Sequence, residues 1–337
     1  MSWMNGLNGH SLAWLLEAEN PAVRAMALRD LLNRSQLYPE LQAALKDAHQ
    51  HGPIAEILAE MDSSGYWVKS GSGYNPKYRS TVWAITLLAQ LGASIEQDKR
   101  LEKACSYLLG HTLTDEGQFS TTGAPSGTID CLQGNLCWAL LQMGCRDERL
   151  NRAIEWMARS VTGDGIAPTG TRNAPLRYYA TKCGPCFACG ANNKLPCAWG
   201  ATKVMLAFGQ IKPGERTVLI KKAIEQGTDF LFSVDPADAA YPTAAGSKPS
   251  RDWWKFGFPV FYITDLLQVV EALTALGCQH DPRLARAINL IRQKQDALGR
   301  WTLVYDYSGK TWGQYGEKGQ VNKWVTLRAL RVLKTIG

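Results

Sequence analysis

The sequence predicts an all-α fold built from five to six repeated pairs of helices. A turn with the pattern Gly-x-aromatic recurs along the chain, and each copy is followed by a polar loop and an apolar helix. Amphipathic segments with helical spacing lie between the apolar helices. Signals for β-strands are weak, because no stretch keeps up an alternation of apolar and polar residues. We give internal repeats more weight than any single motif, because a repeated pattern indicates the architecture of the whole fold.

The repeats are visible as turns followed by apolar helices. The turns lie at Gly65–Trp67, Gly117–Phe119, Gly163–Gly165, Phe256–Phe258 and Gly299–Trp301, and the helices begin near Ser80, Cys131, Cys197, Thr264 and Lys323. The loops into these helices run roughly 10–30 residues, longer than the loops of HEAT-type solenoids, the main rival architecture. Long loops repeated on one face are usually where function resides.

The amphipathic segments carry clear helix start signals. Asn20-Pro21 and Asp281-Pro282 each pair a capping residue with a proline at the first helical position. Segments 97–109, 147–160 and 215–232 have similar amphipathic patterns. An apolar helix alternating with a two-faced one is what a double ring of inner and outer helices requires. We therefore predict a single α/α toroid domain over residues 1–337, in which residues 1–60 complete the ring and residues 61–337 carry the repeats.

Composition limits the classes of function. Of the 337 residues, 45% are hydrophobic and 20% charged, which is typical of a folded globular protein. No apolar run approaches the ~20 residues of a membrane span, and no signal peptide is apparent, so we expect a soluble, cytoplasmic protein. The net charge of +7 comes from scattered Lys and Arg residues, which does not favour nucleic-acid binding. An anionic small molecule in a locally basic cavity suits the pattern better.

The densest local signal is a cysteine cluster. Cys183, Cys186 and Cys189 are spaced by three residues in a loop with Gly and Pro, and Cys197 follows. Four thiolates can surround one soft metal ion, and we expect zinc first and an iron–sulfur cluster second. The metal would be structural or would take part in the reaction. Free cysteines or a redox dithiol at Cys183 and Cys186 are the alternatives, although the strand–helix context of redox motifs is missing.

Three residues are candidates for catalysis. Asp265 lies in the apolar stretch 261–267, and a buried carboxylate without a partner becomes a general acid or base. The alternative is a buried salt bridge to Arg251 or Lys255. Cys131 opens an inner helix at the position that Cys197 takes in the next repeat, so the two should lie side by side. The Asp130–Cys131 pair would act as acid, base or nucleophile, or would take part in the metal site; the alternative is that Asp130 is simply a helix cap.

Basic and aromatic residues gather in the loops and at the starts of helices. If the ring closes, these stretches converge on one opening, where Arg and Lys bind an anion and aromatic rings line an apolar wall. The alternative is that they pack the ring and solvate its rim. The candidate substrate-binding residues are Arg79, Arg177, Arg251, Trp254, Lys255, Tyr262 and Lys323.

Residues 295–301 match the Gln-x-x-x-Gly-x-Trp signature of squalene-type cyclases completely. Over about residues 50–337 the pattern resembles the terpenoid cyclase and protein prenyltransferase superfamily. The resemblance implies an α/α toroid in which Gln and Trp tie outer helices together. It does not carry an activity over, because this chain lacks the Asp-x-Asp-Asp acid of class II cyclases. It also lacks the prenyltransferase zinc motif, since Asp130 and Cys131 are adjacent rather than spaced as Asp-x-Cys.

These observations lead to one main hypothesis and two alternatives. The main hypothesis is an enzyme that acts in the central cavity on an anionic, isoprenoid-like small molecule, with a cysteine-ligated zinc nearby. The absence of known catalytic motifs favours a non-catalytic scaffold that binds a small molecule or a protein. The cysteine cluster alone favours a thiol-redox or metal-handling protein.

Overall fold

The computed structural model describes residues 2–244, 246 and 248–337. The described residues are mainly helical, with a short antiparallel pair of strands, β1 (Ala188–Cys189) and β2 (Leu195–Pro196). The prediction of an all-α fold is therefore confirmed. In this part of the chain, no helix combines the length and the apolar character that a membrane crossing would need.

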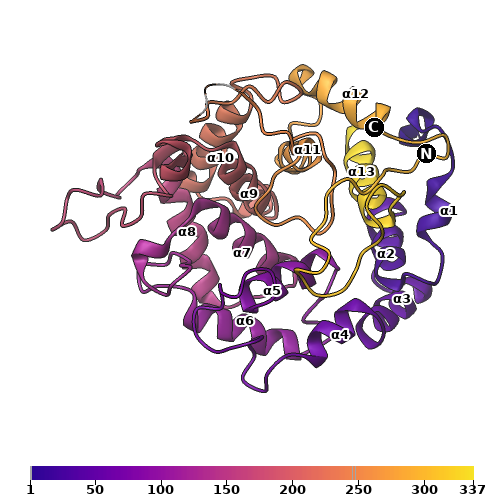
Figure 1. The fold of residues 1–337 in the computed structure, drawn as a ribbon, viewed down its shortest axis with the longest axis horizontal. Helices are drawn as coiled ribbons and strands as arrows, with labels where there is room; N and C mark the ends of the chain where they lie inside the picture. Colours follow the sequence, from indigo (N-terminus) through magenta and orange to yellow (C-terminus); the bar gives the residue numbers. More distant parts are fainter. Residues whose placement is uncertain (1, 245, 247) are drawn as a thin grey trace.

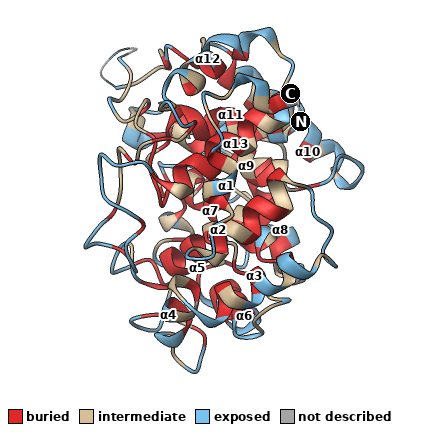
Figure 2. Ribbon diagram, turned by 90° about the vertical axis from the view of Figure 1, so that its right-hand side faces the viewer, coloured by how far each residue is buried: buried red, intermediate tan, exposed pale blue. Residues whose placement is uncertain are grey.

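The apolar segments form an inner layer of helices. These are α2 (Pro21–Met26) with its π-helical continuation η2 (Ala27–Leu31), α5 (Thr81–Gln90), α7 (Asp130–Gln142), α9 (Ala198–Gly209), α11 (Leu266–Ala275) and α13 (Lys323–Ile336). Each of the helices from α5 to α13 packs against the next in this list, and α13 packs against α2 and η2. Figure 1 shows them following one another round the middle of the molecule, and Figure 2 shows that they are largely buried.

The amphipathic segments form an outer layer. Its helices are α3 (Pro39–Gln50), α4 (Pro53–Ala59), α6 (Arg100–His111), α8 (Glu148–Thr162), α10 (Val218–Leu231) and α12 (Ala285–Gln293). α6, α8, α10 and α12 pack on α5, α7, α9 and α11 respectively. α10 buries Ile220, Ala223, Gly227 and Leu231, which form a single stripe along the helix. The predicted alternation of buried and two-faced helices is confirmed in these four pairs.

Short elements complete the chain. At the N-terminus, η1 (Ser2–Gly6) and α1 (Ser11–Leu15) pack on α13. The remaining short helices are η3 (Pro125–Gly127), η4 (Pro185–Phe187), η5 (Gly190–Asn192), η6 (Pro213–Glu215) and η7 (Pro282–Leu284). The start signals act as predicted, because the side chains of Asn20 and Asp281 accept hydrogen bonds from Val23 N and Arg283 N.

Three of the Gly-x-aromatic turns have the same geometry. Gly65, Gly117 and Gly299 have φ values of 96°, 96° and 72°, a region that favours glycine. A Cβ at these positions would lie 2.8 Å from Lys103 O in α6, 3.0 Å from Arg152 O in α8 and 3.1 Å from Gly9 O. The first two turns therefore pack against the backbone of the next outer helix, and the third packs against the N-terminal segment before α1.

The third of these contacts joins the two ends of the chain. The amide of Gln295 accepts a hydrogen bond from Asn8 N at 2.9 Å and donates one to Gly6 O at 3.2 Å. The indole of Trp301 donates to Ile291 O at 2.8 Å in α12. The Gln and Trp of the signature thus link the last outer helix to the N-terminal segment, and Figure 1 shows the ends of the chain beside each other.

The other two turns depart from the predicted repeat. Gly163 ends α8 in a left-handed conformation, and no aromatic residue follows it in the motif position. The fourth copy, Phe256–Phe258, does not form the turn at all. Its Gly257 pairs with Tyr305 in an isolated β-bridge, and the ring of Phe258 stacks on that of Trp324 at 4.5 Å. The prediction of a repeat turn at Phe256–Phe258 was wrong, because this segment shares residue types with the three turns but not their backbone conformation.

Long loops lead into the inner helices, as predicted, and their aromatic side chains meet in the middle of the molecule. We call Tyr74, Tyr78, Trp83, Phe261, Tyr262 and Tyr307 the aromatic cluster. The ring of Tyr78 lies 4.9 Å from that of Trp83 and 4.7 Å from that of Tyr307, and Trp83 lies 5.3 Å from Phe261. Because these residues come from three different loops and α5, the cluster holds the loops together across the centre.

The packing of Gly65 on α6 can be tested with a matched pair of substitutions. Gly277 has nearly the same φ, 99°, but a Cβ there would meet nothing within 4 Å. Gly277→Ala should cost about 1–2 kcal/mol for the left-handed backbone alone. Gly65→Ala should cost at least about 1 kcal/mol more, because its Cβ collides with Lys103 O. Urea unfolding measures both losses, and equal losses would contradict the proposed contact.

Candidate functional site

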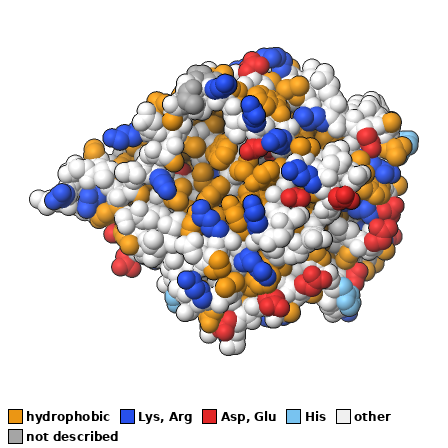
Figure 3. Space-filling model, in the orientation of Figure 1, with side chains coloured by type: hydrophobic (Ala, Val, Ile, Leu, Met, Phe, Trp, Pro, Cys, Tyr) orange, Lys and Arg blue, Asp and Glu red, His pale blue; other side chains and the backbone are white. Residues whose placement is uncertain are grey.

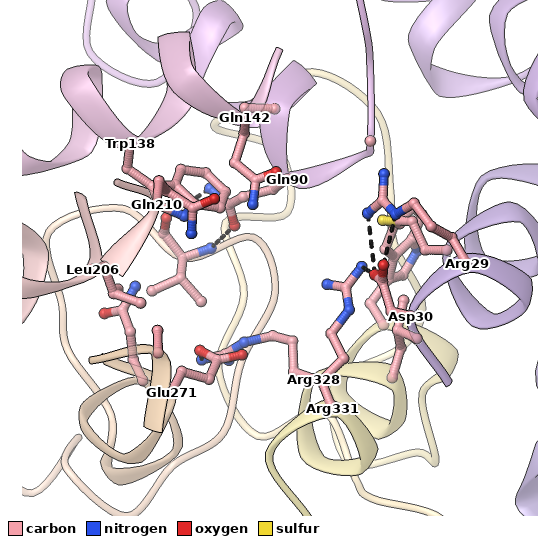
Figure 4. Close-up of a pocket in the computed structure, with 18 of the residues that line it drawn as sticks. Arg29, Asp30, Gln90, Trp138, Gln142, Leu206, Gln210, Glu271, Arg328 and Arg331 are labelled. Carbon is pink, nitrogen blue, oxygen red and sulfur yellow. Dashed lines mark hydrogen bonds and ion pairs between the residues drawn. The ribbon is translucent and has the colours of Figure 1, made fainter. Parts of the chain in front are cut away.

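A cavity of about 590 Å³ lies between the inner helices. All of the inner helices contribute to its wall, and much of the lining comes from the C-terminal halves of α5, α7 and α9. Figure 4 shows Gln90, Trp138, Gln142, Leu206 and Gln210 on this wall. The volume is within the range of roughly 300–1,000 Å³ that is usual for small-molecule sites.

The cavity lies toward the short connections that follow the inner helices. Gly92, Ser94 and Gly144 from these connections belong to its lining. Toward the long loops it is closed by the segment around Val260, whose backbone N–H and C=O both bond to the side-chain amide of Gln90, at 2.7 and 2.8 Å. The aromatic cluster includes the next two residues of this segment, so aromatic side chains fill the space between the inner helices on the loop side.

At one end of the cavity, two arginines share a single aspartate. Asp30 of η2 accepts hydrogen bonds from Arg29 Nε at 2.6 Å and from the guanidinium of Arg331 on α13, and Figure 4 shows the three side chains together. Burial by itself would raise the pKa of Asp30, but Arg331 and Arg29 lower it to about 2. Two cations thus share one carboxylate, which leaves one positive charge and spare N–H donors for an anion.

A second buried charge network lies between α11 and α13. Arg328 donates to both carboxylate oxygens of Asp265, at 3.0 and 3.1 Å, and to Glu271 Oε2 at 3.0 Å. Arg328 and Glu271 line the cavity, whereas Asp265 lies behind them. Burial raises the pKa of Glu271, although Arg328 opposes the shift.

Asp265 therefore has a structural role in the network. It also caps α11, since its side chain accepts a hydrogen bond from Gln268 N at 2.7 Å. The sequence-based alternative of a buried salt bridge was right about the kind of contact and wrong about the partner. Arg328 makes the bridge, and Lys255 pairs with Asp252 at 2.7 Å instead.

A lysine lies in the cavity wall without a carboxylate partner. Lys203 of α9 has only 1% of its surface exposed, and its Nζ donates to Gln268 Oε1 and, at 3.5 Å, to Ile263 O. Neither acceptor is charged, and no ion pair to Lys203 occurs in the described residues. Burial lowers the pKa of Lys203 to about 7.

Amide and apolar side chains complete the wall. Gln142 and Gln210 point into the cavity beside Trp138 and Leu206 (Figure 4), and neither side-chain amide has a hydrogen-bond partner within the part of the chain that the structure describes. Phe258 and Trp324 add aromatic surface. The cavity can therefore enclose an apolar body and bind polar groups at several points.

The predicted substrate-binding residues lie elsewhere. None of Arg79, Arg177, Arg251, Trp254, Lys255, Tyr262 and Lys323 belongs to the described lining of the cavity. Several have local partners instead: the guanidinium of Arg79 lies over the ring of Trp312 at 4.4 Å, and Lys323 pairs with Glu17 at 2.7 Å. Tyr262 is part of the aromatic cluster. Figure 3 shows hydrophobic side chains over the middle of one face with Lys and Arg around them.

Asp130 is buried at the start of α7 but neither caps the helix nor pairs with Cys131. Its Oδ1 accepts hydrogen bonds from Cys183 Sγ at 3.1 Å and Ser160 Oγ at 3.4 Å, and its Oδ2 has no partner in the described residues. Burial raises the pKa of Asp130 to about 7. The pairing with Cys183 was missed because it joins residues 53 positions apart.

The four predicted metal ligands do not come together. Cys183 turns toward Asp130, whereas Cys186 is exposed on a backbone with φ 49°. The thiol of Cys189 contacts that of Cys197, which also contacts Cys131. Cys131 and burial raise the pKa of Cys197 to about 12, although Cys189 opposes the shift. Cys131 and Cys197 are thus side by side as predicted. No group of three or more His, Cys, Asp or Glu residues within the described part of the chain is arranged to hold a metal ion. Zinc and the iron–sulfur cluster stay predictions without structural support.

Sequence reasoning missed the residues that do line the cavity. Arg29, Asp30, Lys203, Glu271, Arg328 and Arg331 are charged residues inside inner helices. Lys203 is the sole charged residue of α9, which is the same signal that singled out Asp265. Lys203 was not predicted, because the predicted substrate-binding residues were sought in loops and at the starts of helices.

The chain is similar to several solved structures at low identity. No protein-family model and no curated protein matches the chain. The type II terpene cyclase MstE from Scytonema is 13% identical, over 86% of this chain and 97% of that one, with a TM-score of 0.31. A variant of this cyclase in complex with geranylgeranyl dihydroxybenzoate is 14% identical, over 89% and 98%, with a TM-score of 0.34. A protein from Actinoplanes is 14% identical, over 88% and 99%, with a TM-score of 0.30.

The structural role of Asp265 can be tested against a matched surface residue. Asp265→Asn should lower the free energy of unfolding by about 3 kcal/mol or more, because it leaves the buried Arg328 short of its main counter-charge. Asp281 also accepts a backbone hydrogen bond at a helix start and pairs with an arginine, but on the surface. Asp281→Asn should cost less than about 1 kcal/mol. Urea unfolding of both variants is the measurement, and a small effect of Asp265→Asn would show that the network contributes little.

The raised pKa of Asp130 predicts a pH dependence of stability. Between about pH 4 and pH 7 the folded state keeps a proton that the unfolded state loses, so stability should fall as the pH rises, by up to about 1.4 kcal/mol per pH unit. Asp130→Asn cannot ionise and should flatten this slope. Unfolding midpoints measured at half-unit steps from pH 4 to pH 8 compare the two proteins. The same slope in both would rule out Asp130 as its source.

Proposed function

We propose that the chain is a single α/α toroid domain whose central cavity binds and chemically converts a small molecule with an isoprenoid-like apolar body and an anionic group. The observation that carries the proposal is the cavity itself, a chamber that all of the inner helices line and that contains buried charges. Burying a charged side chain costs folding free energy. Charged groups that line a cavity in spite of this cost are candidates for binding and catalysis.

The wall of the cavity supports each part of the ligand. Arg29 and Arg331 share Asp30, so this end can accept an anionic group in place of water. Trp138, Leu206 and Trp324 offer an apolar surface to the body of the molecule. Lys203 and Glu271, with a lowered and a raised pKa respectively, are the groups suited to proton transfer. We therefore propose that the reaction takes place at the cavity wall rather than at Asp130, Cys131 and Asp265. The proposed location of the protein is the cytoplasm.

A non-catalytic scaffold is the second candidate. It is favoured by the side-chain amides of Gln142 and Gln210, which are free to bind a ligand and are poor acids and bases. A scaffold would use the same cavity and the same anion-binding end. The two candidates differ in whether replacing Lys203 or Glu271 abolishes turnover while leaving binding intact.

Binding can be tested with three probes that separate the apolar body from the anionic group. Farnesyl diphosphate should raise the melting temperature of the protein, farnesol should do so less, and inorganic diphosphate alone should have little effect. Arg331→Gln should weaken farnesyl diphosphate binding about 10-fold or more, because it removes one charge-assisted contact. Isothermal titration calorimetry gives the affinities.

Arg283→Gln is the matched control for this experiment. Arg283 also pairs with an aspartate, Asp281, but it lies in η7, away from the described lining of the cavity. Its replacement should leave the affinity unchanged. Leu206→Trp, which narrows the cavity, should weaken farnesyl diphosphate and farnesol alike. If no probe binds, or if Arg331→Gln binds as well as the wild type, the anionic, isoprenoid-like ligand is wrong.

A further inference from the structure

Lys203 is the most unusual charged residue in the cavity wall. It lies in the middle of α9, and its side chain is buried. Its ammonium group donates to two uncharged acceptors, the side-chain amide of Gln268 and the carbonyl of Ile263. A lysine ammonium normally reaches water or a carboxylate, because burial without a counter-charge is costly. The neighbouring carboxylates, Asp265 and Glu271, are both bound to Arg328.

The backbone around Lys203 is held tightly. α7 and α9 pack closely, and a Cβ on Gly134 of α7 would lie 2.2 Å from the Lys203 carbonyl carbon. Only a glycine allows this approach, so the start of the lysine side chain is fixed relative to α7. Gln268, which accepts from Nζ, lies one turn before Glu271 on α11, and both line the cavity with Lys203.

The titratable groups near Lys203 come from three elements. Cys131 lies on α7, Asp265 and Glu271 belong to α11 and its cap, and Arg328 lies on α13. Burial favours the neutral amine, Cys131 and the two carboxylates favour the ammonium, and Arg328 opposes it. A neutral lysine amine is a nucleophile for carbonyl carbons, and the usual route to it is burial or a neighbouring cation.

We propose that Lys203 is a nucleophilic catalytic residue that forms an imine with an aldehyde or ketone group of the cavity's ligand. This inference deepens the proposed function, on which it rests, by naming a carbonyl group as the reacting part of the substrate. Gln268 holds the amine in position by accepting one of its hydrogens, and Glu271 is the proton donor of the same wall.

The reaction is balanced without any further reactant. The lone pair of Lys203 Nζ adds to the carbonyl carbon, and a proton moves from nitrogen to the carbonyl oxygen, which gives a carbinolamine. Glu271 then protonates the hydroxyl group, water leaves, and the C=N bond forms. The iminium proton returns to the carboxylate of Glu271, so one amine and one carbonyl give one imine and one water.

Reductive trapping tests this proposal on the wild-type protein. Propanal is small enough to enter the cavity without recognition of an apolar body, and sodium cyanoborohydride reduces any imine to a stable propyl amine. Peptide mapping by mass spectrometry then follows each lysine with time. Lys203 should be alkylated at least about 10 times faster at pH 7 than Lys221, an exposed lysine of α10, since more of it is unprotonated. Its rate should rise between pH 6 and pH 8.

Protection by farnesyl diphosphate separates this inference from the proposed function. Fast alkylation that farnesyl diphosphate blocks would support both. Fast alkylation of Lys203 without protection would keep the nucleophile and overturn the proposed ligand. Binding of farnesyl diphosphate to a protein whose Lys203 reacts no faster than Lys221 would overturn the nucleophile alone. In Lys203→Met, the alkylated peptide should disappear while Lys221 reacts as before.

Discussion

Gly299 lies against the backbone of Gly9, and this contact brings the last turn of the chain against its first segment. Gln295 and Trp301 add hydrogen bonds on either side of it, so that α12 is joined to the residues before α1. The equivalent contacts of Gly65 and Gly117 link consecutive outer helices earlier in the chain. Because the final contact links residues nearly 300 positions apart, it brings α13 against α2 and η2, and the cavity between the inner helices depends on that closure.

The enclosed space is divided into two unlike halves. On the loop side, the aromatic cluster joins three loops by ring contacts and fills the middle. On the side of the short connections, the inner helices line the cavity, whose wall carries amides and paired charges. Gln90 marks the boundary, because its amide bonds to the backbone of Val260 while its helix lines the cavity. Apolar packing thus stabilises one half and leaves the other free to bind.

The buried arginines of the cavity differ in how many carboxylate partners they have. Arg328 has two carboxylates, whereas Arg29 and Arg331 share one. Two arginines therefore share one negative charge at Asp30, and Lys203 lies near carboxylates that are already bound to Arg328. Such an arrangement costs folding free energy, which is the usual mark of groups held for binding or reaction.

The helices and their order can be predicted from the sequence alone. Periodicity identifies the buried face of a helix, and α6, α8 and α10 lie where the pattern placed them, because that property is local. It also predicted that Cys131 and Cys197 would be neighbours, since equivalent positions of consecutive repeats meet. Three features depend on the folded chain: the side of the inner helices that stays hollow, the pairing of Asp265 with Arg328, and the contact of Cys183 with Asp130 rather than with the other cysteines. These features depend on which loops fill the centre and on contacts between residues far apart in the sequence. Neither produces a periodic pattern in the sequence.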